Sequence, residues 1–132
     1  MKKIAIILSL FLALVNTAMA QDDDKIRDKM REYIQQRLKL NNDEAEKFTP
    51  IFLRYFREWR TTLRDNRGDK LILQQRIAEL RIRYRDEFRG VLGERKSNEV
   101  YQHQERFIQE IRTVREERIN ARPLRRNRSL LE

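Results

Sequence analysis

Apolar residues recur at spacings of three and four along most of the chain, which is the pattern of amphipathic helices. The first predicted helix covers residues 25–39 and ends at the polar break Leu40-Asn41-Asn42. The second covers residues 42–66. Its stripe is rich in aromatic residues and consists of Ala45, Phe48, Phe52, Tyr55, Phe56, Trp59 and Leu63.

Two further helices are predicted after the turn Asn66-Arg67-Gly68-Asp69. The third covers residues 69–92. Its stripe is close to a heptad seam and consists of Leu73, Ile77, Leu80, Tyr84, Phe88 and Val91. The fourth begins near residue 94 or 97 and ends at Ala121, before Pro123. Its apolar stripe is formed by Val100, Gln104, Phe107, Ile108, Ile111, Val114 and Ile119.

The residues at the predicted helix ends support these boundaries. Asn41 and Glu44 have the spacing of a capping box, with Asn in place of the usual Ser or Thr. Pro50 lies inside the second stripe, which continues in phase beyond it, so we expect a kink rather than an end. Gly93 suits a left-handed helix end. Residues 123–132 are predicted to be a basic, disordered tail.

The first 20 residues are predicted to be a secretory signal peptide rather than part of the fold. Lys2 and Lys3 precede an apolar run from Ile4 to Val15, and Ala18-Met19-Ala20 forms a cleavage site. The run is shorter than the roughly 17–25 residues that span a bilayer. We therefore expect cleavage after Ala20 and a single helical domain over residues 21–122.

The high content of charged residues predicts a domain with a small hydrophobic core. Charged residues form 39% of the chain against about 25% in typical proteins, and the formal net charge is +9. Four narrow stripes with charged opposite faces predict an all-α fold of about four helices in two hairpins, elongated rather than compact. A small chain with so thin a core is marginal alone, so we expect a homodimer.

The chain offers little for catalysis. It has no cysteine, which excludes thiol chemistry and thiolate metal sites, and it has one histidine, His103. His103 and Glu99 are four residues apart, but two ligands make a weak site, and a surface histidine is the simpler interpretation. The sequence therefore predicts a binding protein rather than an enzyme, without cofactor or metal.

Two short segments resemble each other and a known family. Leu40-Asn41-Asn42-Asp43-Glu44 and Leu92-Gly93-Glu94-Arg95-Lys96 each close one helix and open the next. They are similar to the paired Leu-Thr-x-x-Gln motifs of the Spy/CpxP/ZraP group of periplasmic proteins. The first segment keeps Leu40, with Asn41 for Thr and Glu44 for Gln. The second keeps only Leu92.

The run from Phe48 to Phe52 also resembles members described as heavy-metal sensors or as sensors linked to extracytoplasmic-function sigma factors. The resemblance implies a cradle-shaped, antiparallel, all-helical dimer in the periplasm. It implies ATP-independent binding of unfolded proteins or a regulatory role in envelope stress. Metal binding in the group depends on His-rich or Cys-bearing segments, which this chain lacks.

The aromatic and basic residues of the second helix are the candidate contact surface for a client or partner. They are Phe48, Phe52, Arg54, Phe56, Arg57, Trp59, Arg60 and Arg64. The rings either pack in the core and a dimer interface or line a surface for unfolded chains. The arginines either form a solvated face or a basic groove that attracts acidic segments in a salt-sensitive manner.

The arginines near the C-terminus permit a weak contact with anionic lipid head groups, although Glu110, Glu116 and Glu117 dilute them. Export removes nucleic acid as a partner. Two functions remain open. One is a periplasmic chaperone that binds unfolded envelope proteins, and the other is a regulatory sensor that binds one specific partner.

Overall fold

The computed structural model describes residues 22–128, with side chains placed from residue 22 to residue 121. The predicted signal peptide and its cleavage site lie outside these residues. The described chain is all-α and contains three helices and no strand. They are an N-terminal helix over residues 22–37, α2 (Asn42–Asp65) and α3 (Lys70–Arg128). None of them is both long enough and apolar enough to cross a lipid bilayer.

The start of α2 follows the predicted capping box. The Asn41 side chain accepts a hydrogen bond of 2.8 Å from the backbone N–H of Glu44, and the Glu44 carboxylate accepts one from the backbone N–H of Asn41. Lys39 has a positive φ of 54°, which turns the chain between the N-terminal helix and α2. Pro50 lies inside α2, and the helix continues through it to Asp65, as predicted.

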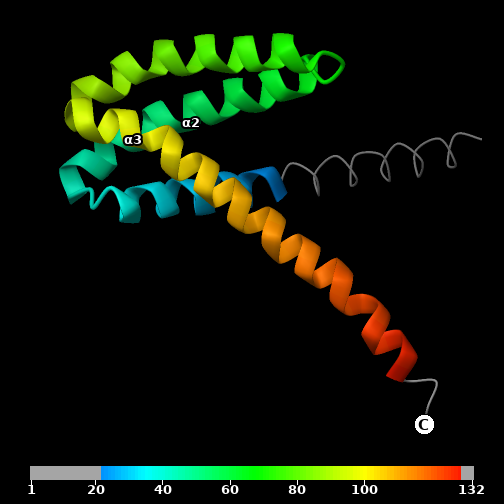
Figure 1. Cartoon of the computed structure of the whole chain (residues 1–132). Coiled ribbons are helices and arrows are strands. Elements are labelled where there is room, and N and C mark those ends of the chain that lie inside the picture. Colours follow the sequence, from blue (N-terminus) through cyan, green and yellow to red (C-terminus); the bar gives the residue numbers. More distant parts are fainter. Residues whose placement is uncertain (1–21, 129–132) are drawn as a thin grey trace, which may run out of the picture.

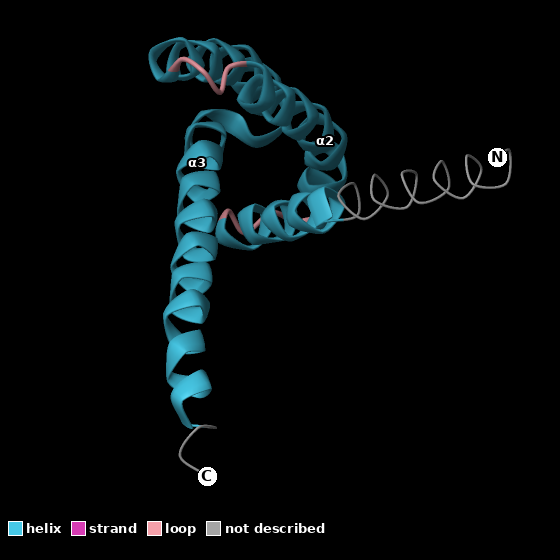
Figure 2. Ribbon diagram, turned by 90° about the vertical axis from the view of Figure 1, so that its right-hand side faces the viewer, coloured by secondary structure: helices cyan, strands magenta, loops and turns pink. Residues whose placement is uncertain are grey.

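α2 and the first part of α3 form a hairpin around residues 66–69 (Figure 1). The Asp69 carboxylate accepts hydrogen bonds from the backbone N–H groups of Leu71 and Ile72, at 3.0 and 3.1 Å, and so caps α3. The N-terminal helix packs beneath this hairpin. Figure 2 shows the hairpin across the upper end of the long stem formed by the end of α3, with the N-terminal helix to one side of that stem.

The prediction of four helices in two hairpins is wrong, because the third and fourth predicted helices are one element. α3 runs from Lys70 to Arg128 and is bent at Gly93, whose φ of 78° and ψ of 174° are not helical. No turn residues separate the segments on either side. A single glycine changes the direction of the helix axis, so a second loop is not needed.

The C-terminal end of α3 also differs from the prediction. Pro123 was expected to end the helix, yet α3 continues to Arg128. The disordered tail expected over residues 123–132 stays a prediction. Every side chain from residue 109 to residue 121 is exposed, so water can bind the carbonyl that Pro123 leaves without a donor. Residues 129–132 lie outside the described part. We call residues 109–128 the arm, which projects from the body in Figure 1.

The core is a single cluster formed by the predicted stripes of the three helices. The stripes of the N-terminal helix, α2 and the middle of α3 are buried, with Ile34, Phe52 and Phe88 fully inaccessible. The stripe of the arm is not buried: Ile111, Val114 and Ile119 are 37%, 46% and 56% exposed. The arm therefore carries an apolar stripe that the other described residues leave partly exposed.

Because α3 bends at Gly93, substitution of Gly93 and of the nearby Gly90 by alanine should have opposite effects on stability. Gly93 lies in a backbone region that is essentially restricted to glycine, so Gly93→Ala should lower the free energy of unfolding by about 1–3 kcal/mol. Gly90 lies within the helix, and no neighbouring atom lies within 4 Å of the position that a Cβ would take. Gly90→Ala should therefore raise the free energy of unfolding by up to about 1 kcal/mol. Urea denaturation followed by circular dichroism measures both. Equal effects of the two substitutions would contradict the bend.

Candidate functional site

The aromatic residues of α2 that sequence analysis placed in the candidate contact surface form the centre of the core. Phe48 and Phe52 are fully buried, and Phe56 and Trp59 are 4% and 8% exposed. The Phe48 ring lies 5.5 Å from that of Phe52 and 5.3 Å from that of Phe88 in α3. This placement favours the packing interpretation for Phe48, Phe52 and Phe56, whose rings are not an open surface for an unfolded chain.

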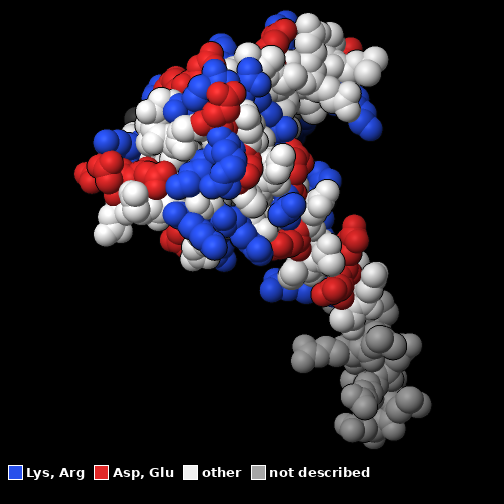
Figure 3. Space-filling model, turned by 60° about the vertical axis from the view of Figure 1, so that its left-hand side comes forward, with Lys and Arg blue, Asp and Glu red and all other residues white. Residues whose placement is uncertain are grey.

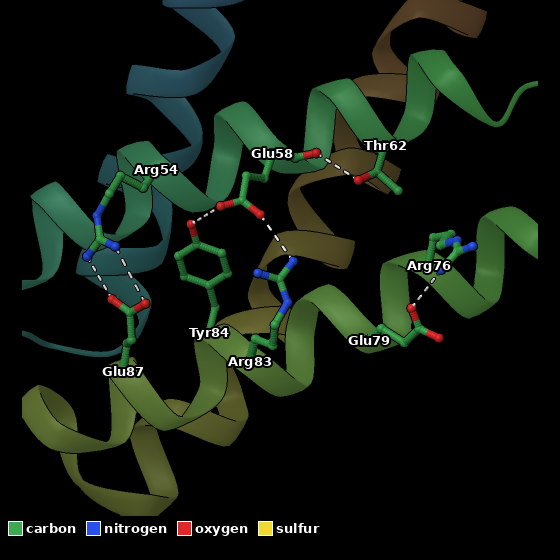
Figure 4. A network of polar contacts seen from close by, with 8 residues as sticks. All are labelled: Arg54, Glu58, Thr62, Arg76, Glu79, Arg83, Tyr84 and Glu87. Carbon is green, nitrogen blue, oxygen red and sulfur yellow. Dashed lines mark hydrogen bonds and ion pairs between the residues drawn. The ribbon is translucent and has the colours of Figure 1, made fainter.

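The arginines of the same candidate surface point outward, and several are paired with carboxylates. Arg54 donates two hydrogen bonds to Glu87 across the hairpin, the shorter of 2.7 Å (Figure 4). Arg60 pairs with Asp23 of the N-terminal helix, and Arg64 pairs with Asp65 at 3.1 Å. Arg57 is exposed. Figure 3 shows basic side chains gathered over one face of the body, with acidic side chains interspersed among them.

Glu58 connects α2 to α3 beside Arg54, as Figure 4 shows. Its carboxylate accepts hydrogen bonds from the Tyr84 hydroxyl at 2.6 Å and from Arg83 at 3.1 Å. The Tyr84 hydrogen bond holds the pKa of Glu58 below its ordinary value. Burial, together with the Glu58 contact, raises the pKa of Tyr84 to about 12. The pair is a polar contact that joins the two helices of the hairpin. The Tyr84 hydroxyl stays protonated at neutral pH.

An open groove lies between the hairpin and residues 105–112 of α3, and we call it the central groove. It has a volume of about 700 Å³. Its apolar lining comes from the end of α2, the start of α3 and the base of the arm, and consists of Trp59, Leu63, Leu73, Ile77, Ala78 and Ile108. Apart from Trp59, which is buried, and Ala78, which is exposed, these side chains are half-buried, so they offer apolar surface to a partner while resting on the core.

The rim of the central groove is basic. Arg60, Lys70, Arg81 and Arg112 line it, against the single carboxylate of Glu105. Arg81 pairs with Glu105 and Arg60 pairs with Asp23, which leaves Lys70 and Arg112 to set the field at the rim. Of the eight residues predicted as a contact surface, Trp59 and Arg60 line this groove. The groove therefore combines apolar contact area with positive charge. Only the edge formed by Trp59 and Arg60 belonged to the contact surface predicted from the sequence.

A second open groove of about 740 Å³ lies between the N-terminal helix and the arm, and we call it the arm groove. Its apolar lining includes Ile26, Phe107 and the exposed arm residues Ile111, Val114 and Ile119. Lys29, Arg115 and Arg118 supply positive charge. Glu110 also lines it and accepts a hydrogen bond of 3.0 Å from the Tyr33 hydroxyl.

The two motif segments meet in space. The Lys96 ammonium, from the second segment, donates to the Glu44 carboxylate of the first at 2.9 Å. This contact lowers the pKa of Glu44. Leu92 is buried and Leu40 packs against the core beside it in the same cluster. The motif residues Leu40, Asn41, Glu44 and Leu92 thus cap α2 and join its start to the bend of α3, which is a structural role.

The described residues contain no group of three or more His, Cys, Asp or Glu side chains that could hold a metal ion. His103 is half-buried, and burial together with the nearby Arg106 lowers its pKa. It is therefore neutral at physiological pH. Its Nδ1 atom is buried without a hydrogen-bond partner in the described part of the chain.

Neither groove was predicted from the sequence, although the apolar residues that line them were recognised as stripes. Leu73, Ile77 and Ile108 were assigned to core stripes, because periodicity shows which face of a helix is apolar but not whether another helix covers it. The exposure of Ile111, Val114 and Ile119 follows from the direction of the arm after Gly93, which periodicity does not contain. The dense charge around these positions was the available indication.

Comparison with known proteins returned no match to any protein family, curated protein or solved structure. The resemblance to the Spy/CpxP/ZraP group therefore rests on the short motifs alone.

Proposed function

We propose that this protein is an ATP-independent, chaperone-like binding protein that holds apolar segments of unfolded envelope proteins in the central groove. The observation that carries the proposal is the groove itself, an open channel of about 700 Å³ with a half-buried apolar lining and a basic rim. The N-terminal leader pattern supports the periplasm as the place of action.

The groove suits an extended, variable chain better than a small ligand. It is open, and its apolar residues come from three separate stretches of the chain, so a bound segment contacts several of them without a single deep pocket. Apolar contacts are non-directional and tolerate many sequences. The cations at the rim attract acidic segments and speed encounter, and this contribution weakens with salt.

The test is suppression of aggregation by residues 21–132, with two unrelated denatured clients and no ATP, at low and at high salt. Both clients should be protected at near-stoichiometric amounts, less well at high salt. The paired substitution Lys70→Gln and Arg112→Gln removes two exposed rim cations and should reduce protection several-fold. Arg57→Gln with Arg67→Gln removes the same charge elsewhere and should leave protection nearly unchanged.

Two outcomes would overturn this proposal. One is no protection by a chain that circular dichroism shows to be folded and helical. The other is binding of a single partner at fixed stoichiometry without protection of either client, which would point to the regulatory sensor instead.

A further inference from the structure

The arm carries an amphipathic surface that the proposed function does not use. Its apolar residues Ile111, Val114 and Ile119 are 37%, 46% and 56% exposed, and all three line the arm groove rather than the central groove. Arg115 and Arg118 lie on the same face, since Arg118 follows Val114 by four positions and Ile119 follows Arg115 by four. An exposed apolar row flanked by arginines indicates a surface that binds a partner.

The charge of this face identifies the chemistry of the partner. The arm groove has three cationic side chains, Lys29, Arg115 and Arg118, and one carboxylate, Glu110, which is already hydrogen-bonded by Tyr33. Glu116 is outside its lining, and Glu117 lies with Val114 on the neighbouring side of the arm. The face is therefore complementary to an anionic partner, whereas a second copy of this basic chain would bring charge of the same sign.

The shape of the arm fits a flat partner. The arm extends past the N-terminal helix that borders the arm groove, as Figures 1 and 2 both show, so its outer part stands clear of the other described elements. Helices with an apolar stripe and basic residues beside it lie in the interface of anionic bilayers, with the apolar side chains among the acyl chains. The aliphatic stems of arginines cover apolar surface while their guanidinium groups reach the head groups.

We propose that the arm binds the surface of an anionic phospholipid bilayer. Ile111, Val114 and Ile119 enter the interface, and Lys29, Arg115 and Arg118 contact lipid phosphates. The contact holds the body at the membrane and leaves the central groove, on the other side of the base of the arm, open. This inference does not depend on the proposed function, because it uses a different face of α3.

Sedimentation of residues 21–132 with vesicles tests it. The chain should bind vesicles of phosphatidylcholine mixed with phosphatidylglycerol and should bind phosphatidylcholine vesicles only weakly. Arg115→Gln with Arg118→Gln should weaken binding about 25-fold, since each basic residue near an anionic surface contributes a factor of roughly five. The matched control, Arg57→Gln with Arg67→Gln, should weaken it less than about threefold.

A second pair of variants tests the apolar part. Val114→Ser with Ile119→Ser removes half-exposed side chains of the arm and should weaken binding about tenfold. Leu71→Ser with Ile82→Ser removes side chains that are 77% and 54% exposed elsewhere on α3 and should have little effect. All variants change exposed positions, so helicity should stay at the level of the unsubstituted chain.

Three results would overturn the proposal. The first is equal binding to neutral and anionic vesicles, and the second is equal loss of binding in the arm variants and their controls. The third is absence of vesicle binding together with a dimer that the arm variants dissociate, which would make this face an interface between copies. None of these results bears on protection of unfolded clients, so the two proposals fail separately.

Discussion

Phe88→Ala should lower the free energy of unfolding by about 3–5 kcal/mol, the largest effect that we expect from any single substitution in this chain. Phe88 is fully buried, and its ring lies 5.3 Å from Phe48, 6.2 Å from Tyr55 and 6.2 Å from Tyr101. It therefore connects α2 with both segments of α3. Small domains are stable by only about 5–15 kcal/mol, so this loss is a large fraction of the total stability and should clearly lower the urea midpoint.

Urea denaturation followed by far-UV circular dichroism measures this effect. Leu71→Ala is the matched control, because it also shortens an apolar side chain of α3, but one that is 77% exposed. Its effect should be within about 0.5 kcal/mol. A loss below about 1 kcal/mol for Phe88→Ala would mean that the aromatic cluster is not the core of the fold.

Arg81→Leu should lower the free energy of unfolding by about 1.5–3 kcal/mol, the second-largest effect. The Arg81 guanidinium donates hydrogen bonds to the Tyr55 hydroxyl at 3.4 Å and to the Gln104 side-chain oxygen at 3.3 Å, and it pairs with Glu105. Tyr55 in turn donates to Gln104 at 2.6 Å in the buried interior. Leucine fills part of the volume but removes the donors from these buried acceptors.

Arg83→Leu is the control for Arg81→Leu. Arg83 is two residues away in the same helix and also forms an ion pair, with Glu58, but its side chain is 65% exposed against 23% for Arg81. Exposed pairs contribute about 0–1 kcal/mol, so the loss should stay below about 1 kcal/mol. Similar losses in the two variants, measured by the same denaturation, would contradict a stabilising role for the buried network.

Much of the local structure was predictable, because it depends on neighbours in sequence. The capping box of Asn41 and Glu44, the turn at residues 66–69 and the continuation of α2 through Pro50 all follow from local backbone chemistry. The buried stripes were also predictable, down to the polar Gln104, which is fully buried. Helical periodicity alone placed it there.

The arrangement of the elements was not predictable in the same way. Gly93 was expected to end a helix, and it does take a positive φ, but it bends α3 instead of starting a loop. Whether a glycine ends or bends a helix depends on what the following segment packs against, and that is a tertiary property. Pro123 failed as an end point for a related reason, since an exposed helix can leave a carbonyl to water.

The candidate site was predicted only in part. Trp59 and Arg60 line the central groove, whereas Phe48, Phe52 and Phe56 pack inside the core. Clustering of aromatic residues along a helix shows that they share a face, but a buried face and a contact surface have the same pattern. The central groove lies between the hairpin and the second part of α3, and the arm groove lies between the N-terminal helix and the arm, so only the fold places both. The predicted antiparallel dimer stays a prediction.

Site-specific photo-cross-linking tests directly whether unfolded chains bind in the central groove. A photoreactive residue replaces Gln74, which is exposed and lines the groove, or Lys47, which is exposed near the start of α2. Each protein is irradiated with the same denatured client. If unfolded chains bind in the central groove, cross-linking should be strong from position 74 and weak from position 47. Equal cross-linking from both positions, or cross-linking from position 47 alone, would contradict it.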